Sequence, residues 1–69
     1  MNEFQKFVFE MPYGMADEFR KKVVKECGVT EGLFRLWRSG FPVKKQENRE
    51  AIDRIATEMF GRKVFTDQV

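Results

Sequence analysis

The chain contains no histidine and only one cysteine, and these two scarcities exclude several kinds of site. No nucleophile stands beside a base, and no cluster of metal ligands is present. The single Cys27 follows the apolar Val23 and Val24 at helical spacing, so we expect a small core residue rather than a reactive thiol. The sequence therefore predicts a protein that is not an enzyme and holds no cofactor and no metal.

Long apolar runs are also missing. No segment approaches the roughly 18 apolar residues of a membrane span, and the acidic Glu3 and Glu10 stand where a secretory signal needs basic and apolar residues. We expect a cytoplasmic protein with no membrane partner. Because 42% of the 69 residues are hydrophobic, disorder is not expected, and the length suits a single domain over residues 1–69.

Apolar residues recur at helical spacing in several segments, which predict helices over residues 4–11, 16–27, 30–39 and 51–60. Pro12 ends the first of these, and Gly61 ends the last. Residues 4–11 also fit a strand, because Phe7, Phe9 and Met11 alternate. The favoured fold class is all-α, a small four-helix domain.

Charged side chains on the last helix are expected to form a solvated face, Asp53 among them. The spacing predicts local ion pairs from Glu50 to Arg54 and from Glu58 to Arg62. In the tail, residues 62–69, Val64 and Phe65 either cover the core or form a short edge strand.

The most informative segment is residues 20–40, RKKVVKECGVTEGLFRLWRSG. Gly28 is suited to the left-handed conformation that ends a helix, and the Thr30 side chain is suited to cap the amide groups that begin the next. Two short amphipathic helices around such a turn form a helix-turn-helix, predicted here over about residues 20–39.

These residues resemble the lambda-repressor and Cro-like helix-turn-helix regulators of bacteria and phages. The turn of that family falls on Cys27, Gly28, Val29 and Thr30, and its second-helix core positions fall on Phe34 and Trp37. Ser39-Gly40 followed by Pro42, and a later helix over 51–60, extend the likeness to residues 18–61. The resemblance implies a transcriptional regulator that binds double-stranded DNA by inserting the helix from Thr30 to Ser39 into the major groove.

Charge is segregated along the chain in a way that agrees with a DNA partner. Residues 20–49 carry a net charge of +6, whereas residues 1–19 carry −3 and residues 50–69 carry −1. Positive charge beside an inserting helix neutralises phosphates.

Base contacts are expected from the exposed positions of the second helix: Glu31, Gly32, Arg35 and Leu36. Arginine pairs bidentately with guanine, which makes Arg35 the best candidate for direct readout. Glu31 either accepts from cytosine or stabilises the first helical turn, and Gly32 permits a close approach to the groove. Phosphate contacts are expected from basic or hydroxyl side chains around this helix: Lys21, Lys22, Lys25, Thr30, Arg38, Ser39, Lys44 and Lys45.

Two alternatives compete with this interpretation. The same scaffold serves a small helical protein–protein adaptor, for which an exposed Leu36 is better suited than for a groove contact. Trp37 is expected in the core, and a base-stacking role is the rival. Because so small a domain makes few base contacts alone, a homodimer or tandem sites are expected on a pseudo-palindromic operator, with no small-molecule effector evident.

Overall fold

The computed structural model describes residues 2–65, and within them the fold is all-α, with no strand. The elements are α1 (Glu3–Glu10), a short 3-10 turn η1 (Tyr13–Met15), α2 (Ala16–Cys27), α3 (Glu31–Arg38) and α4 (Gln46–Phe60). The four-helix prediction is confirmed, and the strand alternative for residues 4–11 is wrong. None of the helices in the described part of the chain has the length and apolar character needed to cross a membrane.

The first helix begins with a reciprocal cap. The Gln5 amide N–H donates to Asn2 Oδ1 over 2.9 Å, and the Asn2 N–H donates to Gln5 Oε1 over 3.0 Å. This capping box satisfies two amide groups that a helix start leaves without partners. It explains why α1 is a helix despite the alternating apolar pattern, since the backbone is committed to helix at its first turn.

The turn between α2 and α3 has the local geometry that the sequence predicts. Gly28 ends α2 with φ of 66°, in the left-handed region, and its N–H donates to Val24 O over 3.0 Å. Thr30 Oγ1 accepts from the Leu33 N–H over 3.1 Å and so caps α3. Both predicted roles are confirmed, and α3 is set at a defined angle to α2 by a connection of three residues.

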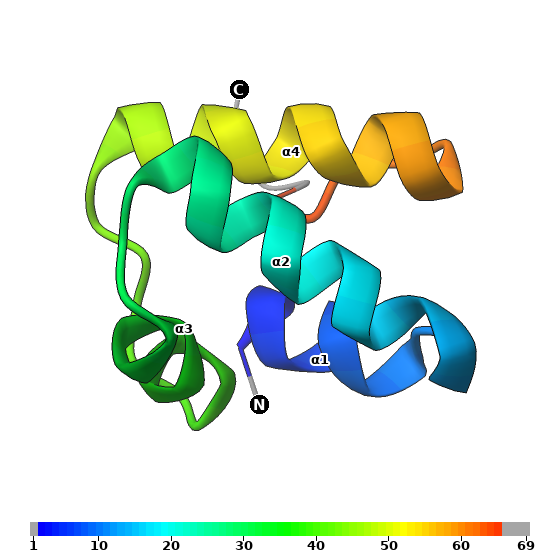
Figure 1. The fold of residues 1–69 in the computed structure, drawn as a ribbon, viewed down its shortest axis with the longest axis horizontal. Coiled ribbons are helices and arrows are strands. Elements are labelled where there is room, and N and C mark those ends of the chain that lie inside the picture. The colour runs from blue at the N-terminus through cyan, green and yellow to red at the C-terminus, as the bar shows by residue number, and fades with distance from the viewer. Residues whose placement is uncertain (1, 66–69) are drawn as a thin grey trace.

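An aromatic cluster joins the helices. The ring centroids of Phe4 and Phe34 lie 5.5 Å apart with nearly perpendicular planes, and Phe4 and Trp37 lie 6.1 Å apart. Phe19 of α2 contacts the same cluster. Figure 1 shows α4 lying across α2, with α1 and α3 on the other side of α2. The core therefore fixes α3 through its two buried aromatic residues, and the prediction that Trp37 is a core residue is confirmed.

The last helix differs from the prediction in two respects. It begins at Gln46 rather than near residue 51, so the connection from α3 is shorter and α4 is the longest helix of the described chain. Asp53 is only 8% exposed, and its Oδ1 accepts from the Val64 N–H over 2.8 Å and the Phe65 N–H over 3.0 Å. The expectation that Asp53 is solvated is wrong, because a returning segment needs its carboxylate as an acceptor.

The segment after α4 covers the core. Val64 and Phe65 are both buried, and the Arg49 guanidinium lies 4.2 Å from the centre of the Phe65 ring. Of the two alternatives for these residues, covering the core is confirmed. The rest of the predicted tail, residues 66–69, lies outside the described residues.

Ion pairs of α4 and the segment after it connect separate elements. Arg54 pairs with Glu26 of α2 at 3.2 Å, and Arg62 pairs with Glu10 of α1 at 3.8 Å. The predicted partners were Glu50 and Glu58, one helical turn earlier in the sequence. The helix packing brings Glu26 and Glu10 within reach, and the two arginines pair with these carboxylates instead.

Candidate nucleic-acid interface

The third helix exposes one side and anchors the other. Phe34 and Trp37 are buried, while Gly32 and Ser39, seven residues apart, lie along the opposite and outermost line of the helix. Glu31, Arg35 and Arg38 follow at spacings of four and three, so they form a charged stripe along one flank. Leu36 lies on the other flank and is 45% exposed.

A shallow depression of about 290 Å³ runs along the charged flank. Its lining consists of Arg20 from α2 and, from α3, Glu31, Phe34, Arg35 and Arg38. The structure thus brings three of the predicted contact residues together and adds Arg20, which the sequence argument did not select.

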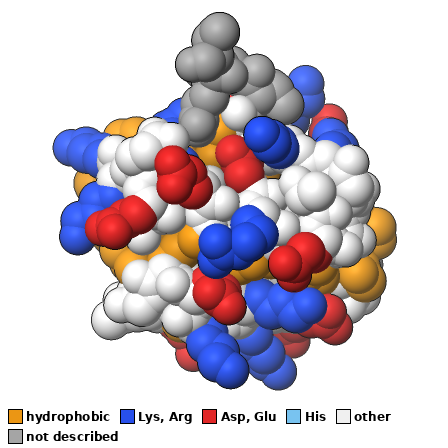
Figure 2. Space-filling model, turned by 90° about the horizontal axis from the view of Figure 1, so that it is seen from above, with side chains coloured by type: hydrophobic (Ala, Val, Ile, Leu, Met, Phe, Trp, Pro, Cys, Tyr) orange, Lys and Arg blue, Asp and Glu red, His pale blue; other side chains and the backbone are white. Residues whose placement is uncertain are grey.

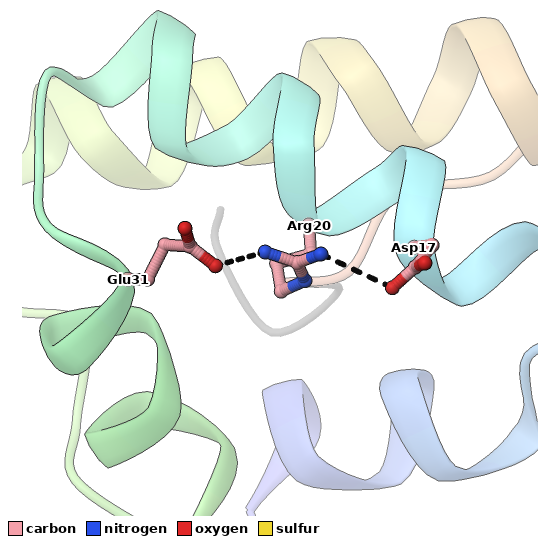
Figure 3. A network of polar contacts seen from close by, with 3 residues as sticks. All are labelled: Asp17, Arg20 and Glu31. Atoms are coloured by element: carbon pink, nitrogen blue, oxygen red, sulfur yellow. Dashed lines mark hydrogen bonds and ion pairs between the residues drawn. The ribbon is translucent and has the colours of Figure 1, made fainter.

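Arg20 lies between two carboxylates (Figure 3). Its Nη2 is 3.1 Å from Asp17 Oδ1 on the same helix, and its Nη1 donates to Glu31 Oε1 at the start of α3. The Glu31 carboxylate is therefore both partly neutralised and tied to α2. The sequence spacing does not predict this contact, because the contact depends on how α2 and α3 cross.

Several of the predicted phosphate contacts, and the predicted base contact Arg35, are basic side chains without an acidic partner in the described chain. Within residues 2–65, no ion pair engages the exposed side chains of Lys21, Lys25, Arg35, Arg38, Lys44 and Lys45. Lys22 differs, because its Nζ is 3.4 Å from Glu18 Oε2. Unpaired surface cations keep their full attraction for an anionic partner.

The predicted contacts do not all share one surface. Lys22 and Lys25 line a separate depression of about 240 Å³ between α2 and α4, where Glu26 and Glu58 also lie. Lys44 and Lys45 are on the connection that leads from α3 to the start of α4 (Figure 1). The charged stripe of α3 is therefore one part of the candidate interface, and Lys22, Lys25, Lys44 and Lys45 lie outside its depression.

The two hydroxyl residues at the ends of α3 already serve the helix. Besides the Thr30 cap, Ser39 Oγ donates to Leu36 O over 2.8 Å. Thr30 can still donate its hydroxyl hydrogen to a phosphate oxygen, because its oxygen only accepts in the contact with the Leu33 amide.

Cys27 behaves as a packing residue. Its side chain is half-buried against the core, and its Sγ lies 3.9 Å from Asn48 O. Burial raises the pKa of the Cys27 thiol, and the nearby Glu26 carboxylate raises it further while Arg54 opposes both. The thiol is thus disfavoured as a thiolate nucleophile. Among residues 2–65, no group of three or more acidic, cysteine or histidine side chains is placed to hold a metal ion.

Comparison with known proteins found no matching family model, no matching curated protein and no matching solved structure.

Proposed function

We propose that this protein binds double-stranded DNA sequence-specifically as a transcriptional regulator, with α2, the Gly28 turn and α3 acting as a helix-turn-helix. In this proposal α3 enters the major groove, and Arg35 pairs with the acceptor edge of a guanine. The single observation that carries the proposal is the exposed, unpaired arginine stripe on a helix whose other side is held in the core.

The rigidity of α3 supports a reading role. Phe34 and Trp37 are both packed against Phe4, so the helix cannot rotate without breaking aromatic contacts. An arginine on such a helix presents its guanidinium from a nearly fixed backbone, which lowers the conformational cost of a defined base contact.

The Arg20–Glu31 pair supports the same proposal electrostatically. A carboxylate on the first turn of an inserting helix would repel the phosphates on either side of the groove. Because Arg20 pairs with Glu31, that repulsion is reduced where α3 would meet the DNA. Arg35 and Arg38 then leave a net positive charge along the stripe.

The decisive experiment is fluorescence anisotropy on labelled random duplex DNA at about 50 and 200 mM salt. The parent should bind at low salt and weaken steeply at high salt. Arg35→Ala should lose roughly tenfold or more in affinity for a selected site, as expected for one guanine contact. Arg54→Ala is the matched control, because it removes an exposed arginine of α4 that is paired with Glu26.

Two results would reject the DNA proposal. The first is a parent that fails to bind duplex DNA at low salt. The second is an equal loss in Arg35→Ala and Arg54→Ala, which would mean that only total charge matters and that α3 reads no bases.

The adaptor function remains a second candidate because two apolar side chains are exposed at the end of α3. Leu36 is 45% exposed and Phe41 57% exposed, and the Phe41 N–H donates to Leu36 O over 3.0 Å, which keeps the two residues together. An apolar protein interface centred there would respond little to salt. Salt dependence therefore separates the two functions in one titration.

A further inference from the structure

We propose that the surface of α1 beside α3 is a self-association site, which takes Phe9 and Glu10 of a second copy of this chain. The site is a shallow groove of about 260 Å³ lined by Gln5, Val8, Phe9 and Arg38. It is separate from the depression of the candidate DNA interface, although Arg38 borders both.

Phe9 is the most exposed of the large apolar side chains in the described chain, at 79%. The other aromatic residues of α1, Phe4 and Phe7, are buried and make ring contacts. No ring contact within residues 2–65 involves Phe9. Leaving a phenylalanine in water forgoes the stabilisation that its burial provides, and a partner that covers it recovers that stabilisation.

The charge of the groove indicates what kind of side chains its occupant should carry. Arg38 is the charged residue of the lining, and no carboxylate lines the groove. An apolar side chain next to a carboxylate is therefore complementary to it. Phe9 followed directly by Glu10 is such a pair, and it lies on the same helix as the groove.

The distribution of charge along the chain favours the same occupant. α1 carries Glu3, Lys6 and Glu10, a net charge of −1, and α3 carries Glu31, Arg35 and Arg38, a net charge of +1, so α1 of one copy is attracted to α3 of another. α1 and α3 lie together in each copy, since Asn2 Nδ2 donates to Gly40 O over 3.2 Å just beyond α3. A two-fold arrangement then forms each Phe9 and Glu10 contact twice.

Glu10 is available for such a contact at little cost. Its present partner, Arg62, is 3.8 Å away, and both side chains are about half exposed. Exposed pairs of this kind contribute little to stability. The exchange of Arg62 for Arg38 of a second copy therefore leaves the fold of each copy intact.

Sedimentation equilibrium without DNA tests this inference independently of the proposed function. From about 1 μM to about 1 mM, the parent should show a concentration-dependent monomer–dimer equilibrium. Phe9→Ser should raise the dimer dissociation constant at least about tenfold, as for a central aromatic anchor. Phe41→Ser, which removes another exposed phenylalanine outside the groove, should leave it within about twofold. Circular dichroism melting should show that both variants fold like the parent.

Charge exchange tests the contact itself. Glu10→Arg and Arg38→Glu should each weaken the dimer, and the double variant should restore it, because the pair is rebuilt with reversed signs across the interface. A parent that stays monomeric at the highest concentration would overturn the inference and leave the groove to a partner of another sequence. A dimer that tolerates Phe9→Ser, or one that the double variant fails to restore, would also overturn it.

Discussion

The outer faces of α3 and α4 differ in how their charges are used. Figure 2, which looks onto α4, shows acidic and basic side chains interspersed over that face. Arg54 of α4 is paired with Glu26 of α2, whereas Arg35 and Arg38 of α3 have no ion-pair partner within residues 2–65. Arg54 of α4 is thus engaged within the domain, and the two arginines of α3 remain available to a partner.

The buried faces of the same two helices differ in a parallel way. α4 buries Ala51, Ile52, Ile55 and Ala56 along its length, together with Asp53. α3 buries only Phe34 and Trp37. The long helix is thus held by many small contributions, and the candidate recognition helix is held by two large ones, which makes it sensitive to single substitutions.

The largest effect is expected at the anchor of α3. Trp37→Ala should lower the free energy of unfolding by about 3–5 kcal/mol, because a buried indole is replaced by a cavity. In a domain of this size such a loss removes most of the stability. Urea denaturation followed by circular dichroism measures it. An unchanged midpoint together with lost DNA binding would instead give Trp37 a base-stacking role.

A smaller loss is expected at the buried carboxylate of α4. Asp53→Ala should cost about 2–3 kcal/mol, since the amide groups of Val64 and Phe65 lose their acceptor in a buried environment. Asp53→Asn keeps one acceptor oxygen and should cost less. Glu50→Ala, an exposed carboxylate on the same helix, is the control and should change stability by no more than about 0.5 kcal/mol. Equal losses at residues 53 and 50 would contradict this role for Asp53.

The Arg20–Glu31 contact should contribute little to the stability of the fold but should have a measurable effect on DNA affinity. A double-mutant cycle with Arg20→Ala and Glu31→Gln should give a coupling of about 0.2–1 kcal/mol at low salt, as for other surface pairs. Arg20→Ala should also weaken duplex DNA binding, because it leaves the Glu31 carboxylate unneutralised. Adding Glu31→Gln should then recover part of the binding. If Glu31→Gln has the same effect with and without Arg20, the two residues act independently.

The smallest expected effect is on the reactivity of the Cys27 thiol. Because burial raises the pKa of its thiol, alkylation by iodoacetamide should have its midpoint at a higher pH than that of an unstructured cysteine peptide. The folded state favours the neutral thiol, so this contribution to stability is fully present below the unfolded pKa and is lost as the pH rises through the folded one. Rapid alkylation at neutral pH would contradict this environment.

The features predicted correctly from the sequence are those that neighbouring residues control. Gly28 adopts the left-handed conformation that ends α2, Thr30 caps α3, and Gly61 ends α4 with φ of 75°. Phe34 and Trp37 share one face of α3 by helical spacing, which predicted both as buried. Backbone conformation and side-chain periodicity suffice for such features.

The tertiary structure alone decided which charges meet. Arg20 reaches Glu31 across a turn, Arg54 takes Glu26 rather than Glu50, and Asp53 is buried under the segment that follows its own helix. Each of these contacts depends on how two elements pack against each other. The spacing of residues within one helix carries no information about that packing. The sequence thus determined the helices, most of their ends and their apolar faces, whereas packing determined which carboxylates are neutralised and which arginines stay unpaired. Local backbone preferences act over a few residues, but ion pairing depends on distances that only the folded chain sets.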